Sequence, residues 1–411
     1  MTMNYVEMAE CLLDVGGSGN MNFTIIVVYR GEMALEPLQH ALSFLQSQHT
    51  MLRTTLRWSG ADCSFALTNA SVPLRRMVNT DFSQWRGVAQ EDVRQRFEDP
   101  NHPLWRVSWL QGQGEGQLLL TFHHAIADGV CGMQLVDHLF SALKQLTEGR
   151  SPQPLGFDNP ELALDFLNNL TDVEPEPEAA PEPREDKDYH TDYILDEIDA
   201  EATSRVIQWA KAQEVRLNAV LFAALLLAIR RVTQTSYPIL DASTVVNFRP
   251  FLKDPVPRDV MRLTRVCVVT PVPIEEFDNG MAKLARFIHS DLYARLAAGE
   301  HVVNLKRMAQ RVERKETPQC IWRRARIPEH QVILTNIGNL DFAGDYDGLS
   351  VDKLFFIANV EPAFDSPDNW ILGSVTFQGR MYLTLWYLEE LVEEATATRV
   401  LAEMKRILED L

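Results

Sequence analysis

The chain has 411 residues, of which 46% are hydrophobic and 23% are charged. This balance is typical of a soluble globular protein, and the length predicts two lobes rather than one core. The formal net charge of −18 disfavours nucleic acid as a partner, because phosphates require a basic protein surface. The most apolar run, Ala219 to Ile229, has eleven residues, whereas a membrane-spanning helix needs about 20. We therefore expect a buried helix there and no membrane span.

The five cysteines include no Cys-x-x-Cys pair. An odd count without paired spacing argues against a disulfide framework and against a structural zinc site. The start of the chain carries Glu7, Glu10 and Asp14 and lacks the basic segment that opens a secretory signal. We expect a cytoplasmic protein with no metal site and no bound cofactor.

A segment rich in proline and glutamate, Glu174 to Pro183, is the clearest domain boundary. Prolines remove backbone donors, and like charges repel one another and extend the chain. Between Glu174 and Asp188 no hydrophobic residue is larger than alanine, so burial cannot offset the entropy of ordering the segment. We predict an N-terminal lobe of residues 1–170, an acidic linker of residues 171–190 and a C-terminal lobe of residues 191–411.

Hydrophobic periodicity predicts alternating strands and helices in the N-terminal lobe. Apolar and β-branched runs predict the strands, and leucines at helical spacing predict the helices. In chain order these are a strand Phe23–Tyr29, a helix Leu35–Gln48, strands Leu52–Trp58, Trp105–Leu110 and Gln117–Phe122, and a helix Gly132–Leu146.

The C-terminal lobe repeats this mixture of elements. The fold class is therefore α/β or α+β with mixed sheets. In chain order we predict helices Ser204–Gln213 and Ala219–Val232, strands Thr244–Phe248 and Val266–Thr270, helices Met281–Ala298 and Val302–Arg314, strands Val332–Thr335, Leu354–Val360, Leu372–Phe377 and Met381–Tyr387, and a last helix Val392–Leu411.

One loop concentrates side chains that can do chemistry. The segment from His123 to Gly129 has the sequence His-His-Ala-Ile-Ala-Asp-Gly and joins a predicted strand to a predicted helix. Residues in such loops are held by rigid neighbours and face a crevice. An imidazole with a pKa near 6.5 can accept a proton at neutral pH and return it. Attack of an alcohol or an amine on a thioester needs that proton transfer.

The residues alone leave structural and catalytic roles open. Asp128 can orient an imidazole, pair with a cation elsewhere and lock the loop, or cap the helix that follows. Gly129 permits a tight turn that a Cβ would block. Two adjacent histidines with an aspartate suit a metal, but no cysteine or further histidine stands nearby at ligand spacing. A histidine at a strand end is also commonly a structural residue whose hydrogen bonds are satisfied within the protein.

The segment from His123 to Gly129 resembles the signature of the condensation-domain superfamily. That superfamily includes condensation domains of nonribosomal peptide synthesis, polyketide-associated and wax-ester acyltransferases, plant BAHD acyltransferases and chloramphenicol acetyltransferase. An Asp-Phe-Gly-Trp-Gly segment is absent, which disfavours the plant branch. No adenylation, carrier or reductase signature is present, so we expect a stand-alone member. Further similar segments follow in the family's order, over about residues 20–390: His49–Thr54, Pro103–Val107, Leu217–Ala224, Val246–Pro250 and Thr335–Gly338.

The resemblance implies two chloramphenicol-acetyltransferase-like lobes that form a V with a central tunnel. His124 matches the catalytic histidine, a general base or a positioning group, and His123 is expected to shape the loop. Asp128 matches a structural residue that pairs with an arginine, for which Arg249 is the candidate. Asn336 is a candidate for holding the oxyanion near the tunnel. The acceptor would attack the thioester directly, without an acyl-enzyme.

The expected activity is O- or N-acyl transfer to a small alcohol or amine. The donor would be a thioester of coenzyme A or of the phosphopantetheine of an acyl carrier protein, used as a co-substrate. The alternative is a non-catalytic condensation-like module that recruits a carrier protein or a partner enzyme.

A basic cluster with Arg323 and Arg324 is either a docking site for an anionic donor or a solvated face. Cys131, beside the motif, is more typical of a packing residue than of a nucleophile. Gly16–Gly19 lacks the lysine and spacing of a phosphate-binding loop and is predicted to be a flexible loop.

Overall fold

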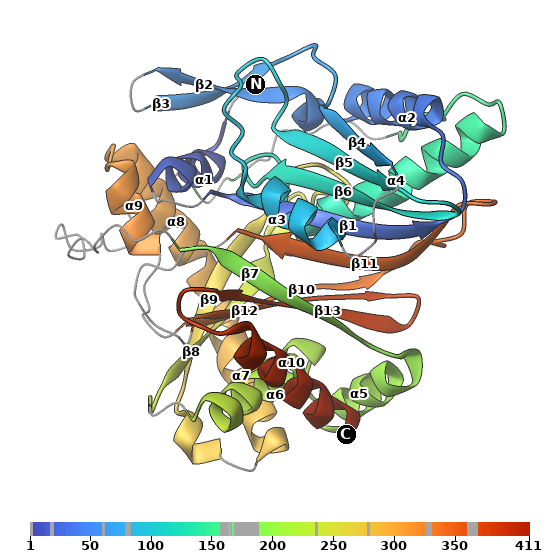
Figure 1. Ribbon diagram of the computed structural model, residues 1–411. Coiled ribbons are helices and arrows are strands. Elements are labelled where there is room, and N and C mark those ends of the chain that lie inside the picture. Colours follow the sequence, from blue (N-terminus) through green and yellow to red (C-terminus); the bar gives the residue numbers. More distant parts are fainter. Residues whose placement is uncertain are drawn as a thin grey trace.

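The computed structural model describes residues 3–16, 20–59, 62–78, 84–156, 164, 167, 189–234, 237–277, 280–325, 331–359 and 369–411. Within these residues the chain forms two mixed α/β lobes, each built on one large sheet (Figure 1). The fold class predicted from the sequence is thereby confirmed. None of the helices described combines the length and the apolar character needed to cross a bilayer.

The N-terminal lobe is built on a five-stranded sheet in the order β11-β1-β6-β5-β4. The pairs β11–β1, β1–β6 and β6–β5 are antiparallel, whereas β4 pairs with β5 in parallel. A separate hairpin is formed by β2 (Thr54–Ser59) and β3 (Asp62–Leu67). The other elements are α1 (Tyr5–Gly16), β1 (Asn22–Arg30), α2 (Leu35–Gln48), the 3₁₀ turn Thr50–Arg53, β4 (Leu74–Val78), α3 (Trp85–Arg94), β5 (Trp105–Gln111), β6 (Glu115–His123) and α4 (Gly129–Thr147).

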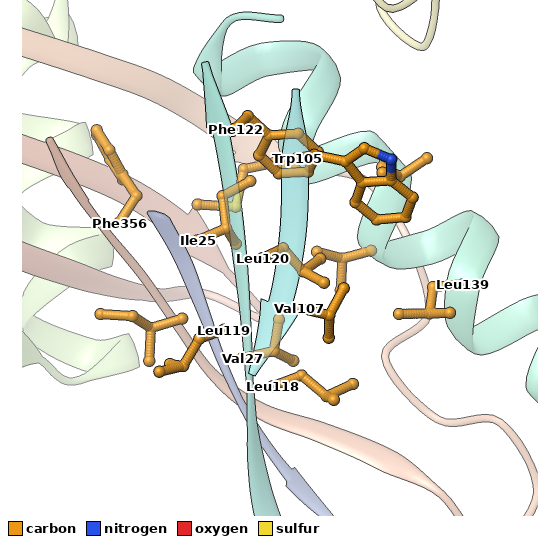
Figure 2. Close-up of a cluster of buried hydrophobic side chains, with 14 of the residues drawn as sticks. Ile25, Val27, Trp105, Val107, Leu118, Leu119, Leu120, Phe122, Leu139 and Phe356 are labelled. Carbon is orange, nitrogen blue, oxygen red and sulfur yellow. The ribbon is translucent and has the colours of Figure 1, made fainter. Parts of the chain in front are cut away.

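Strand β1 is buried on both faces, which explains its apolar run. Alternate side chains of a strand point to opposite faces. Tyr29 faces α4, where its ring centroid lies 6.2 Å from that of Phe140. Asn22 faces the other way, and its Nδ2 donates to the carbonyl of Gln95, just beyond α3, at 2.8 Å. Figure 2 shows the buried side chains of this sheet together with Leu139 of α4. The sheet is therefore enclosed between α4 and α3.

The C-terminal lobe is built on a six-stranded sheet in the order β7-β13-β12-β10-β8-β9. Strand β10 runs parallel to β8 and to β12, and the remaining pairs are antiparallel. Helices α5, α6, α7 and α10 gather on the face away from the N-terminal lobe (Figure 1). The elements are β7 (Thr191–Ile198), α5 (Ala200–Ala212), α6 (Leu217–Thr233), β8 (Leu240–Asn247), the 3₁₀ turns Arg249–Phe251 and Ile274–Phe277, β9 (Arg265–Val272), α7 (Met281–Ala297), α8 (Glu300–Glu313), α9 (Pro318–Ala325), β10 (Gln331–Leu340), β11 (Ser350–Ala358), β12 (Trp370–Phe377), β13 (Arg380–Leu388) and α10 (Glu394–Glu409).

Strands β12 and β13 connect the cores of the two lobes. Trp370 and Leu372 pack into the core that surrounds α6. Their neighbour Ile371 and the facing Trp386 pack into the core of the N-terminal lobe. Because alternate side chains serve different cores, the two lobes meet across an apolar surface. Helix α6 is buried throughout the run from Ala219 to Ile229, as its composition predicted.

Two elements cross from one half of the chain to the other lobe. Strand β11, from the C-terminal half, pairs antiparallel with β1 and places Ala358 opposite Phe23. Helix α1, at the other end of the chain, packs against α8 and α9. Residues 168–188 lie outside the described part of the chain, so the linker at residues 171–190 stays a prediction. The pairing of β11 with β1 and the packing of α1 on α8 and α9 nevertheless hold the two lobes together.

Candidate active site

The loop between β6 and α4 is held against the beginning of β1. Strand β6 ends at His123, and α4 begins at Gly129. The backbone N–H of His124 donates to the carbonyl of Met21 at 2.8 Å, and that of Ile126 donates to the carbonyl of His123 at 3.1 Å. The side chain of His124 is therefore placed by two neighbouring strands and by a tight turn of its own loop.

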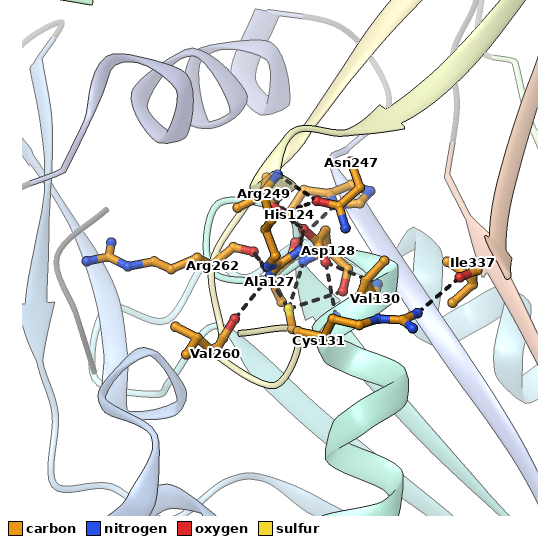
Figure 3. Close-up of polar contacts among 12 residues, drawn as sticks. His124, Ala127, Asp128, Val130, Cys131, Asn247, Arg249, Val260, Arg262 and Ile337 are labelled. Atoms are coloured by element: carbon orange, nitrogen blue, oxygen red, sulfur yellow. Dashed lines mark hydrogen bonds and ion pairs between the residues drawn. The ribbon is translucent and has the colours of Figure 1, made fainter. Parts of the chain in front are cut away.

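Two contacts orient the imidazole of His124: a hydrogen bond, drawn in Figure 3, and a stacked aromatic ring. Its Nδ1 lies 3.2 Å from the carbonyl oxygen of Ala127, and only a protonated Nδ1 can donate to that oxygen. Its ring stacks on Phe23 with the centroids 4.6 Å apart. Burial, and after it the positive charge of Arg265, lowers the pKa of His124 well below the ordinary value of 6.5. The uncharged ring is left with Nε2 as its proton acceptor.

The depressed pKa of His124 predicts a broad pH range for activity. A lowered pKa means that the imidazole stays uncharged at a pH where an ordinary histidine is already protonated. For any reaction that uses this imidazole as a base, we expect kcat/KM to stay nearly constant from pH 8 down to below pH 6, with the folded fraction checked by circular dichroism at each pH. A decline with a midpoint near 6.5 would contradict this environment for His124.

His123 turns to the other side of the loop and does not line the cavity described below. Its Nδ1 accepts from the N–H of Ala125 at 3.0 Å. Its Nε2 lies 3.7 Å from an oxygen of Asp14, and the ring of Phe97 approaches edge-on at 6.4 Å. These contacts support the loop-shaping role expected for His123.

Asp128 has two of the three roles left open by the sequence. Its Oδ1 accepts from the N–H groups of Val130 at 3.0 Å and Cys131 at 3.1 Å, which caps α4. Its Oδ2 lies 2.8 Å from Nη1 of Arg249, and it accepts from the N–H and the hydroxyl of Thr264 at 3.0 and 2.5 Å. Burial opposes ionisation, but Arg249 and Thr264 outweigh it and hold the pKa of Asp128 below its usual value. The carboxylate locks the loop rather than orienting an imidazole.

The ion pair between Asp128 and Arg249 joins the two lobes. Its side chains are only 5% and 3% exposed. Nη2 of Arg249 also donates to the carbonyls of Val260 at 3.1 Å and Arg262 at 3.2 Å. Figure 3 shows Arg249 bonded both to Asp128 of the histidine loop and to the carbonyl groups of Val260 and Arg262. The segment 260–264 of the C-terminal lobe is therefore fixed directly against the histidine loop of the N-terminal lobe.

A cavity of about 140 Å³ lies beside His124. Ligand pockets usually enclose about 300–1,000 Å³, so this space suits the reacting groups rather than a whole substrate. Its wall combines apolar side chains of both lobes with a few polar groups. The apolar ones include Phe23, Ile333, Phe356, Ile371 and Trp386, and the polar ones include Asn247, Arg265, Thr335 and Asn336.

Three family models match the chain. One, described as "Condensation domain", matches residues 16–159, and one, described as "Phthiocerol/phthiodiolone dimycocerosyl transferase C-terminus", matches residues 194–385. A third, described as "Wax ester synthase/diacylglycerol acyltransferase catalytic domain", matches residues 89–247 and thus includes the histidine loop. The chain belongs to the superfamily of condensation domains and polyketide-associated acyltransferases.

Solved structures share the fold of this superfamily member. Polyketide synthase associated protein 5 from Mycobacterium tuberculosis has a TM-score of 0.69 at 17% identity, covering 97% of this chain and 96% of that one. Trichothecene 15-O-acetyltransferase from Fusarium sporotrichioides has a TM-score of 0.69 at 13% identity, covering 98% of this chain and 94% of that one.

Among sequence relatives, polyketide synthase PksN from Bacillus subtilis (strain 168) is 27% identical over 141 residues, which are 33% of this chain. The chain spans only 2% of the length of PksN.

Asn336 lines the cavity, on β10 of the condensation-type fold. Its Nδ2 donates to Oδ1 of Asn218 at 2.7 Å, and its Oδ1 accepts from the N–H of Gly338 at 2.9 Å. These two bonds fix which end of the amide carries the N–H groups. One hydrogen on Nδ2 is used by Asn218, and the second remains for a ligand.

Gly129 is required for a reason other than the one the sequence suggested. Its φ lies outside the left-handed region that favours glycine, so the expectation of a special turn is wrong. A Cβ at this position would instead meet Cδ1 of Ile337, on β10, at 2.6 Å. The missing side chain thus permits α4 of the N-terminal lobe to approach β10 of the C-terminal lobe. No local pattern in the sequence records that approach.

Substituting Gly129 is expected to affect substrate binding more than stability. Ile337 also lines the cavity, so a Cβ at Gly129 pushes its Cδ1 toward the space for substrate. We expect Gly129→Ala to raise KM several-fold and to cost about 1 kcal/mol or less of unfolding free energy, since a flexible side-chain end can shift. Ile337→Val, which lacks Cδ1, should restore KM in the double variant.

Gly87 provides the matched control for Gly129, because a Cβ there meets nothing within 4 Å. Gly87→Ala should leave KM unchanged. A KM increase in Gly129→Ala that Ile337→Val does not relieve would show that the contact with Ile337 is not the cause.

Cys131 is a packing residue. It is fully buried, its thiol donates to the carbonyl of Asp128 at 3.3 Å, and burial raises its pKa to about 12. A thiol with this pKa is not a nucleophile at neutral pH.

The two candidates for donor docking, Arg323 and Arg324, lie on α9, and the structure describes the side chain of Arg324 only. The side chain of Arg324 is 7% exposed, and its Nε lies 3.2 Å from Oε2 of Glu316. Its guanidinium therefore faces the protein rather than solvent. The side chain of Arg323 lies outside the described residues, so its role in docking stays a prediction.

The sequence did not reveal Thr264 and Arg265 as members of the site. Thr264 donates twice to Asp128, and Arg265 lines the cavity with His124. The one available signal was a pair of arginines, Arg262 and Arg265, directly before a predicted strand of an acidic chain. That signal does not indicate which lobe the arginines face.

Proposed function

We propose that this protein transfers an acyl group from a thioester to a hydroxyl or amine, with His124 as the general base. The observation that carries the proposal is the orientation of the imidazole. Its Nδ1 is committed to the carbonyl of Ala127, and the residue lines the cavity between the lobes. The ring therefore offers Nε2 to a group bound there, and membership in a superfamily that includes acyltransferases supports this chemistry.

In the proposed reaction Nε2 of His124 takes the proton of the acceptor O–H or N–H. The freed electron pair forms a bond to the thioester carbonyl carbon, and the carbonyl oxygen becomes an oxyanion. Collapse of this intermediate breaks the C–S bond, and the imidazolium returns its proton to the departing thiolate. The second amide hydrogen of Asn336 is the proposed donor to the oxyanion.

The donor is proposed to be a thioester of coenzyme A or of a phosphopantetheine-bearing carrier protein. No acyl-enzyme is required, because the buried thiol of Cys131, with its raised pKa, is no competitor for the acceptor. All five cysteines are free thiols, which supports a reducing compartment and hence the cytoplasm. The alternative function, recruitment of a carrier or partner without catalysis, would need neither a depressed pKa at position 124 nor a cavity beside it.

The test is acceptor-dependent release of thiol. The protein is incubated with a panel of acyl-CoA donors and alcohol or amine acceptors, and free thiol is followed with a colour reagent while the acceptor is followed by mass spectrometry. Thiol release that requires the acceptor, together with an acylated acceptor, supports transfer. Release without acceptor would indicate hydrolysis, and no release with any donor, including acyl carrier proteins, would favour a recruiting module.

A further inference from the structure

Two buried acidic side chains of helix α1 form ion pairs with arginines at the start of β9 and just before it. Oε1 of Glu7 lies 2.7 Å from Nη1 of Arg262, and Oε2 of Glu10 lies 3.1 Å from Nη2 of Arg265. The two carboxylate side chains are 0% and 3% exposed. Residues three apart share one face of a helix, so a single helical face engages both arginines. The helix itself is capped by Asn4, whose Oδ1 accepts from the N–H of Glu7 at 2.9 Å.

The two arginines differ in what else they reach. Arg265 is the first residue of β9, opposite Asn247 of β8, and both of these residues line the cavity beside His124. Arg262 does not line that cavity. The two ion pairs therefore offer an internal comparison, since they occupy the same helix face and only one of them extends to the cavity.

The charges around His124 come from four elements. Its own loop contributes His123 and Asp128, the 3₁₀ turn after β8 contributes Arg249, β9 contributes Arg265, and α1 contributes Asp14 and Glu10. Asp128 and Arg249 neutralise each other at 2.8 Å, and Asp14 faces His123. Of these groups, Arg265 is the cation that acts most strongly on His124, where its charge adds to the effect of burial.

We propose that Glu10 and Arg265 are positioning residues of the transfer site: Glu10 holds the guanidinium of Arg265 at the wall of the cavity that it shares with His124. There its positive charge opposes protonation of the imidazole. The inference rests on the proposed function, because only a base needs the uncharged ring. A nearby cation also strengthens the imidazolium as an acid. It therefore favours return of the proton to the departing thiolate, and α1 is coupled to the chemistry through one ion pair.

The test measures the titration of His124 itself. The protein is labelled with ¹³C at Cε1 of histidine, and His124→Gln assigns the signal. Arg265→Met should move the midpoint of the His124 titration to higher pH, while Arg265→Lys, which keeps the charge, should stay closer to the wild type. Glu10→Gln and Glu10→Ala remove the same charge, but only Gln keeps an acceptor for Nη2 of Arg265. Glu10→Ala should therefore give a midpoint at higher pH than Glu10→Gln, because the guanidinium is no longer held beside the cavity. This difference should vanish when Arg265 is replaced by Met.

Glu7→Ala and Glu7→Gln are the controls, because Arg262, the partner of Glu7, does not line the cavity. These two variants should give the same midpoint for His124. The same variants are then compared in the pH profile of kcat/KM, where Arg265→Met should shift the acidic limb to higher pH. An unchanged midpoint in folded Arg265→Met, or a difference between Glu10→Ala and Glu10→Gln that persists without Arg265, would overturn the proposal. The titration of His124 can be measured without enzymatic turnover. If no acyl transfer is detected but the midpoints shift as expected, the proposed function is wrong and the positioning of Arg265 by Glu10 is still supported.

Discussion

Replacing His124 with alanine is expected to lower kcat/KM for acyl transfer by about 10²–10⁴-fold, the usual contribution of a positioned general base. The loss should appear in kcat rather than in KM, because the imidazole acts on a proton that moves only during the reaction. Folding should be retained, since the polar contact of the side chain is a single bond to the carbonyl of Ala127. Steady-state kinetics with the preferred donor and acceptor measure the effect, and circular dichroism verifies the fold.

Cys131→Ser is the matched control for His124→Ala. It changes a buried residue just after the same motif and retains a group that can bond to the backbone of Asp128. Transfer should stay within a few-fold of the wild type. If His124→Ala kept more than a tenth of the wild-type kcat, a positioning role would replace the general-base role.

Replacing Asp128 with alanine is expected to have the largest effect on stability, a loss of about 3–5 kcal/mol of unfolding free energy. The change leaves Arg249 buried without its counter-ion and removes the acceptor for the N–H of Thr264. It also removes the cap of α4, where two N–H groups lose their acceptor. Chemical denaturation at pH 7 measures the loss.

The contribution of Asp128 should also depend on pH. Its pKa in the folded protein lies below the ordinary value of 3.8, because Arg249 and Thr264 outweigh the opposing effect of burial. The stabilisation is therefore fully present above that ordinary value and is lost as the pH falls through the folded-state pKa. The difference in stability between wild type and Asp128→Ala should shrink in the same direction.

Asp199→Ala separates the capping effect from the ion pair. Asp199 caps α5 through one bond, to the N–H of Ala202 at 2.8 Å, and is exposed. Its loss should destabilise the protein far less than Asp128→Ala. Equal losses in the two variants would show that the buried pair with Arg249 adds nothing to the cap.

The elements that the sequence predicted well are those with a strong local pattern. Helix α2 has the predicted bounds, Leu35–Gln48, because its leucines recur at helical spacing. Helix α6 follows from eleven consecutive apolar residues, which its complete burial requires. Strand β6 and helix α4 were predicted on either side of the histidine loop, and this local order placed His124 at the end of a strand.

The parts that the sequence missed depend on contacts between distant residues. Helix α1 was not predicted, since Glu7 and Glu10 resemble solvated acids until their arginine partners, 255 residues away, are known. The edge strand β4, Leu74–Val78, has two exposed arginines at its centre and no strand-like alternation. The pairing of β11 with β1 has no local signal either, and neither has the approach of Gly129 to Ile337.

The most direct measurement of the central claim is the tautomer of His124 in the resting protein. A ¹⁵N–¹H correlation spectrum of histidine-labelled protein at pH 7, assigned with His124→Gln, reports which ring nitrogen carries the proton. The structure predicts a neutral ring with the proton on Nδ1, bound to the carbonyl of Ala127, and a bare Nε2 directed at the reacting groups. A proton on Nε2, or a charged ring at that pH, would contradict the assignment of this residue as the base.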